Sequence, residues 1–432
     1  MSEDFVQVVC PGCGLLCDDI KVKVEGGKIV STLHTCARGE WTLRNANSDF
    51  RLTSPLVRKK GKFVKVPFDK ALSRAAEILS SAERPLLWGW SATSVEAQRM
   101  GIHLAQRLGG VIDSTSSICH GSSILAGREA GFRTATLGEV KNRADLIVYW
   151  GSDPGHSHPR HLSRYTTIPR GVYTQTGYEQ KQLITIDVRK ARTGKVANQV
   201  LEIEPNKDYE LISVMRMILK GKDVKNKEIA GIPVKTINQI IQTWKTQQFG
   251  VIFVGLGLSM SRGKYRNIEA LYKLVQELNE YARFVAIPMA GHSNMVGFNQ
   301  VATWLTGQPF GIDLSRGDTY SNPGETTGAE IITRDEFDAM MAIASDPISM
   351  MPLPIARKIA KKPLVAIDCL ETPTTKNADV VLPAAMTGIE AEGTAYRLDS
   401  VPIRLKKFIE PCGECKPDEE ILSLLLEKIE TK

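Results

Sequence analysis

Short apolar runs recur along the chain and alternate with segments of helical pattern. The run at 86–91 ends in a glycine turn, residues 95–108 then read as a helix, and a strand-like segment follows at 110–113. Similar apolar runs occupy 144–150, 183–187, 250–254, 284–287, 340–343 and 364–368. Strands that are buried on both faces of a parallel sheet have this continuous apolar character. The pattern predicts an α/β fold with parallel sheets in doubly wound domains.

A charged hairpin and a helix precede this alternation. Apolar residues at 56–57 and 63–66 flank the basic run 58–62, which predicts a hairpin turn between two strands. An amphipathic helix is expected from Asp69 onward, with apolar residues at Ala71, Leu72, Ala75, Ala76 and Leu79.

The composition is that of a globular protein of about two to four domains. Of its 432 residues, 42% are hydrophobic and 24% are charged. Lysine and arginine outnumber aspartate and glutamate by only 55 to 48, so nucleic acid is not indicated as a partner. The longest apolar stretches, such as 249–260, are interrupted by glycine, and the first residues, Met-Ser-Glu-Asp-Phe, lack a basic and apolar leader. We therefore expect no membrane span and a cytoplasmic location.

The ends of the predicted strands share one kind of chemistry. In open α/β sheets the strand carboxyl ends expose backbone N–H groups that hold phosphates, and an aspartate there accepts hydrogen bonds from a ribose or a purine edge. Two such groups of residues predict two related nucleotide-binding halves. The first comprises Gly151, Ser152, Asp153, Pro154, Asp187 and Arg189, and the second comprises Ser345, Asp346, Pro347, Asp368, Glu371 and Thr372. Gly255 and Gly257 follow a further predicted strand and share this chemistry.

Four thiols are gathered near the start of the chain. Cys10, Cys13, Cys17 and Cys36 are separated by two, three and eighteen residues, which suits a compact loop and a fourth thiol returning from a short hairpin. This spacing favours a 4Fe-4S cluster. Zinc is the alternative, although structural zinc sites usually present two Cys-x2-Cys pairs. Disulfides are disfavoured, because a chain of this length buries a large core without them.

A fifth thiol, Cys119, lies between a predicted strand and a predicted helix, and His120 follows it. A helix N-terminus and an imidazole lower a thiol pKa, so Cys119 is a candidate metal ligand or nucleophile, with His120 placed for proton transfer. The alternative is a structural thiol beside an unrelated histidine.

The remaining cysteines have no such setting. Cys412 and Cys415 are interpreted as free surface or interface thiols, with a disulfide or a metal shared with a partner as alternatives. Cys369 is interpreted as a small buried hydrophobe.

The histidines His156, His158 and His161 surround Arg160 after a phosphate-type turn. We therefore favour a contact with cofactor phosphates over a metal site there.

Further motifs complete a recognisable set. They are Ser54-Pro-Leu-Val-Arg58 through Pro67-Phe-Asp-Lys-Ala71, Ile118-Cys119-His120-Gly121, Gly291-His292-Ser-Asn294, Thr375-Lys-Asn-Ala-Asp379-Val-Val-Leu-Pro383 and Glu390-Ala-Glu392-Gly393-Thr394. With the N-terminal cysteines, they make the chain resemble the molybdopterin oxidoreductase superfamily over its whole length. Within it, the chain is most similar to the family of the B-type subunit of formylmethanofuran dehydrogenase.

This resemblance implies a catalytic subunit of methanogenesis. Its reaction would be the reversible two-electron reduction of CO2 to formate at molybdenum or tungsten held by two molybdopterin guanine dinucleotides, with electrons arriving through a 4Fe-4S cluster. Formate would pass to an amidohydrolase-like partner for condensation with methanofuran. The other implied partners are a small β-barrel pterin-capping subunit and polyferredoxin-type iron–sulfur subunits.

The resemblance also implies residue roles. Cys10, Cys13, Cys17 and Cys36 would hold the cluster, Cys119 would ligate Mo or W, and His120 would handle the proton. Arg38 would lie between cluster and pterin. The implied cofactor-binding residues are those at the strand ends named above together with Arg38, His156, Gly291, His292, Asn294, Asp379, Gly393 and Thr394.

The implied fold consists of interleaved domains. Residues 1–55, with about 390–432, would form an iron–sulfur domain, residues 56–115 with about 290–390 a pterin-nucleotide domain, and residues 116–289 a second one. Only about forty residues follow Thr394, so we expect no C-terminal β-barrel cap domain and a partner that closes the pterin site.

One residue departs from the family pattern. Formate-active relatives tend to carry an arginine where this chain has Ala290, and Arg262 and Arg316 are candidates to replace it. The departure leaves a Mo or W enzyme for another small substrate open, beside a non-redox scaffold of a formyltransferase/hydrolase complex. The choice of metal and the direction of the reaction also stay open.

Overall fold

The computed structural model describes residues 5–431. Residues 1–4, which belong to the predicted iron–sulfur domain and to the start expected to lack a leader, and residue 432 lie outside the described part. The chain divides into two compact units, one formed up to Ile118 and from His292 onward, and the other by Cys119–Gly291. This division does not separate an iron–sulfur domain from the rest of the first unit, so the three-domain scheme stays a prediction.

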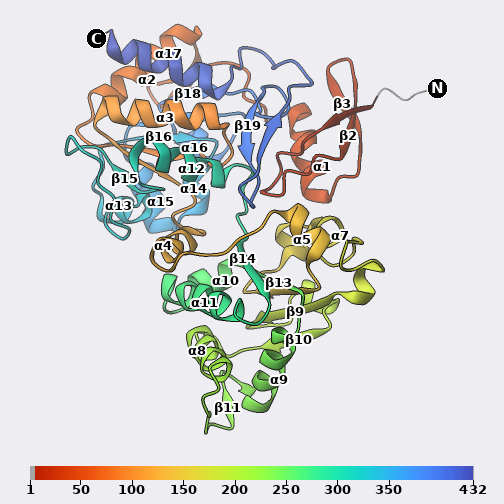
Figure 1. Ribbon diagram of the computed structural model, residues 1–432. Helices are drawn as coiled ribbons and strands as arrows, with labels where there is room; N and C mark the ends of the chain where they lie inside the picture. The colour runs from red at the N-terminus through yellow and green to blue at the C-terminus, as the bar shows by residue number, and fades with distance from the viewer. Residues whose placement is uncertain (1–4, 432) are drawn as a thin grey trace. The chain divides into compact units, whose positions relative to one another are not determined.

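The first unit begins with a small antiparallel sheet, drawn in red in Figure 1. It contains β1 (Phe5–Val8), β2 (Ile20–Glu25) and β3 (Lys28–Leu33), and it is followed by α1 (Ala37–Arg44). Strands β2 and β3 form the hairpin that returns the chain to the first three cysteines.

The larger sheet of the first unit is mixed. Five parallel strands, in the order β7-β6-β16-β17-β18, are flanked by antiparallel β15 on one side and by β4 and β5 on the other. The predicted runs became strands, and the predicted hairpin turns at Lys60 and Gly61, whereas β18 was not predicted as a strand. The bounds are β4 Leu56–Lys59, β5 Lys62–Lys65, β6 Pro85–Gly89, β7 Val111–Ser114, β15 Ile312–Asp313, β16 Ala339–Ile343, β17 Leu364–Asp368 and β18 Val380–Pro383.

Helices cover this sheet, and α2, α3 and α17 lie side by side (Figure 1). Helix α3 shows how the sequence sets its ends: the Ser94 side chain accepts a hydrogen bond from the N–H of Ala97, and Gly109 ends the helix at a φ of 62°. The bounds are α2 Phe68–Ser80, α3 Val95–Leu108, α12 Met295–Thr306, α13 Gly328–Arg334, α14 Pro347–Met350, α15 Leu353–Ile359, α16 Pro373–Asn377 and α17 Asp418–Glu430, with a hairpin of β19 Gly393–Tyr396 and β20 Pro402–Leu405.

The second unit contains a five-stranded parallel sheet in the order β10-β9-β8-β13-β14. Its strands are β8 Leu146–Trp150, β9 Gln182–Asp187, β10 Gln199–Glu202, β13 Phe249–Val254 and β14 Arg283–Pro288. Its helices are α4 Gly121–Ala130, α5 Leu137–Arg143, α6 Pro154–Ser157, α7 His161–Arg164, α8 Asp208–Leu219, α9 Val234–Lys245, α10 Leu256–Met260 and α11 Tyr265–Leu278, and a short hairpin joins β11 Glu228–Ile229 to β12 Ile232–Pro233. Within residues 5–431, no helix has both the length and the apolar character needed to span a bilayer.

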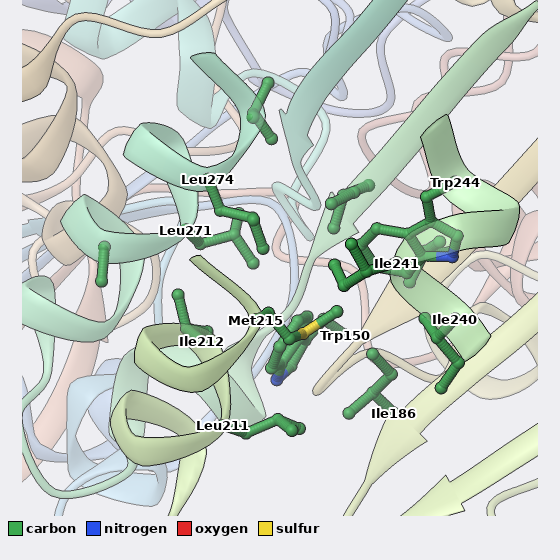
Figure 2. Packing of buried hydrophobic residues seen from close by; sticks show 14 of the residues in the cluster. Trp150, Ile186, Leu211, Ile212, Met215, Ile240, Ile241, Trp244, Leu271 and Leu274 are labelled. Carbon is green, nitrogen blue, oxygen red and sulfur yellow. The ribbon is translucent and has the colours of Figure 1, made fainter. Parts of the chain in front are cut away.

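The core of the second unit centres on Trp150 at the end of β8. Figure 2 shows its ring among apolar side chains from α8, α9 and α11, including Met215, Ile241 and Leu271. The indole N–H donates to Asp208 Oδ1 at 2.9 Å, so the buried nitrogen is satisfied. This packing fixes the strand end immediately before Gly151.

Candidate functional site

The four N-terminal cysteines lie together in the first unit. Three come from the loop between β1 and β2, which is closed by a hydrogen bond from the N–H of Cys10 to the carbonyl of Cys17 at 2.9 Å. Cys36 is the N-cap of α1, and its sulfur accepts from the N–H of Gly39 at 3.4 Å. A Cβ at Gly39 would lie 2.9 Å from Cys10 Sγ. The absence of a side chain at Gly39 therefore lets helix α1 lie close to the cysteine loop without a clash with the Cys10 sulfur.

The setting of these thiols calls for a compensating positive charge. Burial raises the pKa of Cys10 to about 12, and the neighbouring Cys13, Cys17 and Cys36 contribute to this rise. Burial also raises the pKa of Cys13, and the positive charge of Arg38 opposes this. These buried thiols would ionise only if a positive charge, such as that of a bound metal ion, compensated for the buried negative charges.

Arg38 links this region to a predicted residue far along the chain. Its Nε donates to the carbonyl of Gly12 at 2.7 Å. Burial lowers the pKa of His292 to about 4, and the charge of Arg38 adds to the effect. His292 Nδ1 also lies 3.3 Å from Thr115 Oγ1. The structure therefore brings Arg38 and His292 together beside the cysteines.

A cavity of about 330 Å³ opens at the carboxyl ends of β16, β17 and β18. Four of the predicted residues line it: Ser345, Asp346, Asp368 and Thr372. Other parts of its wall come from Pro11, Trp41, Ala92, Ser293, Cys369, Ala384, Met386, Thr387 and Asp418. The cavity lies where the doubly wound pattern predicts ligand binding, and it reaches the cysteine loop through Pro11.

The carboxylates of this cavity differ in their partners. Asp346 Oδ1 accepts from the N–H of Thr374 at 3.0 Å and from its hydroxyl at 2.5 Å, which ties the loop after β16 to helix α16. Asp368 accepts from the N–H of Cys369 at 2.7 Å, and burial raises its pKa to about 6. Burial and the nearby Asp368 raise the pKa of Asp418 to about 7. Asp368 and Asp418 are therefore two acceptors suited to a ligand that brings hydrogen-bond donors.

Equivalent loops occur in the second unit, where glycines allow close backbone contact. Gly151 has a φ of 58°, and a Cβ there would lie 2.5 Å from the backbone nitrogen of Leu258. A Cβ on Gly255 would lie 2.1 Å from the carbonyl oxygen of Gly151, and one on Gly257 would lie 2.9 Å from its Cα. These predicted glycines join the loops after β8 and β13.

Asp153 connects two loops at the carboxyl ends of the second unit's strands, as Asp346 does in the first unit. Its Oδ1 accepts from the N–H of Thr193 at 2.9 Å, and Oδ2 lies 2.6 Å from His156 Nδ1. Burial alone would raise the pKa of Asp153, but the hydrogen bonds from Thr193 and His156 hold it at about 2. Burial raises the pKa of Asp187 at the end of β9, while Arg189 is exposed.

Cys119 and His120 lie where the sequence places them, at the start of α4. His120 is buried and is the N-cap of this helix, and the carbonyl of Cys119 accepts from Ser259 Oγ at 3.1 Å. The expected lowering of the Cys119 pKa was wrong. Burial raises it, and the hydrogen bond from Gly291 opposes this only in part.

Two of the neighbouring histidines do not have the predicted setting. His161 is buried, with Nδ1 at 2.7 Å from the Tyr149 hydroxyl, and burial lowers its pKa far below the usual value. His158 is buried as well, and its Nε2 lies 3.0 Å from the carbonyl of Ala290. Both therefore have structural partners inside the second unit. His156 is exposed beside Asp153, and its predicted contact with cofactor phosphates stays a prediction.

Several other predicted residues hold the fold around the site. The Asn294 side chain donates to the carbonyl of Thr93 at 2.8 Å and accepts from the N–H of Tyr396. Thr394 donates through its hydroxyl to Glu96 at 2.7 Å, and a Cβ on Gly393 would meet Ser94.

Three further predicted residues lie elsewhere. Asp379 lies at the amino ends of β17 and β18, away from the cavity, where it accepts from the N–H of Leu364 at 2.9 Å. Glu371 is exposed and pairs with Lys376. Arg316, a candidate replacement for the missing arginine, is exposed and pairs with Glu325.

Asp418 and Trp41 are cavity residues that the sequence analysis missed. Asp418 opens α17 with two further acidic residues, so in sequence it reads as part of an ordinary helix N-terminus. Trp41 lies on α1, among residues whose pattern indicates only a short surface helix. Asp418 and Trp41 reach the cavity only because segments that are distant in sequence pack together in the fold.

Replacing Asp418 with asparagine is expected to stabilise the cofactor-free chain at pH 8 by on the order of 2 kcal/mol. Asp368 and Asp418 have raised pKa values in the fold, so the folded state retains protons that the unfolded chain releases between about pH 4 and 7. Their contribution to the free energy of unfolding therefore falls as pH rises through that range, and the variant should flatten this fall. Urea unfolding at pH 5 to 8 measures the effect, with Glu419→Gln as the matched control. Equal pH dependence in the two variants would contradict it.

Comparison with known proteins shows the family of this chain. The family described as molybdopterin oxidoreductase matches residues 51–428. The B-type subunit of tungsten-containing formylmethanofuran dehydrogenase 2 from Methanocaldococcus jannaschii is 47% identical over 424 residues, which cover 98% of each chain.

Two solved structures share the fold. Acetylene hydratase from Pelobacter acetylenicus has a TM-score of 0.74 at 16% identity, covering 98% of this chain and 69% of that one. The formyltransferase/hydrolase complex from Methylorubrum extorquens contains a chain with a TM-score of 0.70 at 22% identity, covering 88% of this chain and 99% of that one. One fold thus serves in proteins of different activity, so the site residues decide the chemistry.

Proposed function

This chain belongs to the molybdopterin oxidoreductase family and, within it, to the family of the B-type subunit of formylmethanofuran dehydrogenase, and from this premise we propose that it reversibly reduces CO2 to formate. It is an oxidoreductase subunit of a family that uses a molybdenum or tungsten pterin cofactor. The observation that carries the proposal is the set of five thiols: four lie together, with Cys10, Cys13 and Cys17 buried, and the fifth, Cys119, directly precedes the N-cap of α4.

Cys10, Cys13, Cys17 and Cys36 would hold a 4Fe-4S cluster. None of the four forms a disulfide in the structure, and Cys13, Cys17 and Cys36 contribute to the electrostatic field at Cys10. The four cysteines are separated in sequence by two, three and eighteen residues rather than grouped as two Cys-x2-Cys pairs, which supports the cluster over a single zinc ion. Arg38, next to both the cysteines and His292, would lie between the cluster and the pterin.

The two sets of strand-end loops would each bind one pterin guanine dinucleotide. In the first unit, Asp368 and Asp418 are acceptors that match the N–H groups on the edge of a guanine, and Ser345 and Thr372 offer hydroxyls to the nucleotide. In the second unit, the interlocked loops of Gly151 and Gly255 present backbone beside Asp187. The exposed guanidinium of Arg189 would supply a positive charge to a phosphate there.

Cys119 would ligate the metal, and His120 would exchange the proton. When bound, the metal–pterin group supplies the two electrons that, with one proton, convert CO2 to formate. Burial raises the pKa of the Cys119 thiol, so this thiol would lose its proton only when the metal binds to the sulfur. Burial of His120 keeps bulk water from competing for the proton that it exchanges.

The formate would then pass to an amidohydrolase-like partner for condensation with methanofuran, while polyferredoxin-type subunits deliver electrons and a small β-barrel subunit covers the pterins. The fold recurs in a subunit of a multisubunit formyltransferase/hydrolase complex, which supports assembly with partners. Exposed Trp41, at 65% exposure, and Phe50, at 64%, are apolar residues of the first unit suited to such a contact.

Elemental analysis of the natively purified complex tests this function. We expect molybdenum or tungsten at about one atom per chain, and we expect Cys13→Ala to remove about four irons per chain relative to the wild type. Cys369→Ala is the matched control and should retain the iron. A complex with neither Mo nor W would make this chain a non-redox scaffold. Unchanged iron in Cys13→Ala would contradict the cluster.

A further inference from the structure

The two cysteines near the C-terminus lie in a tight turn with their thiols facing each other. The N–H of Cys415 donates to the carbonyl of Cys412 at 3.1 Å, and the two sulfur atoms are 3.7 Å apart. Gly413 between them has a φ of 57°, and a Cβ there would lie 2.3 Å from the carbonyl oxygen of Thr53. The N–H of Glu414 donates to the same oxygen at 2.9 Å. The turn is therefore held in a conformation that keeps the two sulfurs adjacent.

A buried cation stands beside the pair. Arg51 Nη2 lies 3.3 Å from Cys412 Sγ and 4.0 Å from Cys415 Sγ, and the same nitrogen forms an ion pair with Glu390. The side chains of Arg51 and Glu390 are only 4% and 1% exposed. A guanidinium next to a thiol stabilises the thiolate. The Cys412–Cys415 pair beside Arg51 therefore differs from the free surface or interface thiols that the sequence suggests.

A metal site does not fit the same atoms. The Arg51 guanidinium lies 3.3 Å from Cys412 Sγ and 4.0 Å from Cys415 Sγ, so its positive charge would repel a metal cation bound to these sulfurs. Cys415 already donates to the carbonyl of Leu52 at 3.0 Å.

We propose that Cys412 and Cys415 form a reversible dithiol/disulfide couple. The partly exposed Cys412 sulfur, beside Arg51, attacks a small-molecule disulfide and forms a mixed disulfide, and the Cys412 proton goes to the thiolate that leaves. Cys415 then loses its proton and attacks Cys412 Sγ, which forms the internal disulfide and releases the second thiol. The protein loses two electrons and two protons, and the incoming disulfide becomes two thiols.

The different exposure of the two sulfurs makes Cys412 the attacking thiol and Cys415 the thiol that closes the disulfide. Cys412 is partly exposed, and Gly413 and Glu414 beside it are exposed, so an external disulfide reaches it first. Cys415 is buried, and burial together with Cys412 raises its pKa, so it stays protonated until the mixed disulfide forms. Closure requires the sulfurs to approach from 3.7 Å to about 2.0 Å, which side-chain rotation within a four-residue turn provides.

Oxidation would change the contacts of Arg51. The guanidinium would keep Glu390 and the carbonyl of Cys369, which accepts from Nη1 at 2.8 Å, but it would lose two thiol contacts. Cys415 would also cease to donate to the carbonyl of Leu52. This couple does not depend on the CO2 chemistry proposed above, because it uses none of the residues assigned to that reaction.

The test is a thiol titration of the full chain, purified without oxygen and equilibrated at graded ratios of oxidised to reduced dithiothreitol. Iodoacetamide then traps free thiols, and trypsin releases residues 408–428 as one peptide, because Pro417 blocks cleavage after Lys416. That peptide carries Cys412 and Cys415 as its only cysteines. We expect it to pass from two alkyl groups to none, with the loss of two hydrogens, in a single two-electron transition.

Three variants sharpen the result. Cys369→Ser should leave the transition unchanged, because Cys369 contacts Arg51 through its backbone carbonyl and takes no part in the couple. Cys412→Ser and Cys415→Ser should each abolish the internal disulfide and leave the remaining thiol available for alkylation under reducing conditions. The proposal is overturned by a peptide that keeps both alkyl groups at every ratio, by disulfides only between chains, or by zinc that must be chelated before the thiols react.

Discussion

Replacing Cys119 with serine is expected to lower the rate of CO2-dependent formate production by at least about three orders of magnitude. A serine hydroxyl has nearly the size of the thiol, but it is a much weaker acid and a harder donor than the thiolate proposed to ligate the metal. Cys119 precedes α4, and its backbone carbonyl accepts from Ser259, so the fold itself should tolerate a change of its side chain. We therefore expect a melting temperature close to that of the wild type with the activity gone.

The assay follows formate from CO2 with a reduced viologen as the electron donor, on the complex purified with each variant. Cys412→Ser serves as the control, because it removes a partly exposed thiol outside the proposed active site, and it should retain the wild-type rate. A Cys119→Ser complex that still contains Mo or W and reduces CO2 at the wild-type rate would remove Cys119 from the reaction.

Replacing Glu390 with alanine is expected to lower the free energy of unfolding by about 3–5 kcal/mol. The carboxylate is the anionic partner of Arg51 and accepts from the N–H of Met386 at 2.9 Å. Its loss leaves the Arg51 guanidinium buried with no carboxylate opposite it, and it leaves the Met386 N–H without this acceptor. Urea unfolding monitored by circular dichroism measures the effect.

Glu392 is the matched control for this experiment, since it lies two residues away in the same segment. Its ion pair with Arg404 has side chains that are 61% and 72% exposed. Exposed pairs contribute little, so Glu392→Ala should change the free energy of unfolding by less than about 1 kcal/mol. If Glu390→Ala costs no more stability than Glu392→Ala, the buried pair does not hold this part of the fold.

The secondary structure was predicted from the local periodicity of apolar residues. The helix expected at 95–108 is α3, and the apolar runs at 250–254 and 364–368 lie in β13 and β17. These elements were readable because apolar runs and capping residues are set within a few positions of one another. Strand β18 was missed because its residues were read as part of a longer motif, without a run of their own.

The candidate site was only partly readable. The strand-end residues Ser345, Asp346 and Asp368 were expected at one edge of a sheet, and they do line one cavity. Asp379 belongs to the implied cofactor-binding set, yet it lies at the opposite ends of these strands. A strand separates its two ends by its own length, so neighbours in sequence need not share a site.

The sequence by itself determined most strands of the two parallel sheets, the helix at 95–108, the hairpin turn within residues 58–62, and the gathering of four thiols near the start of the chain. Only the tertiary structure decided that Asp418 stands beside Asp368, that Arg51 pairs with Glu390 across 339 positions, and that Cys119 has a raised rather than a lowered pKa. The physical reason is the distance along the sequence over which each kind of interaction acts. Backbone preferences and apolar periodicity act between near neighbours, whereas burial and ion pairing depend on segments that come together only when the whole unit has folded.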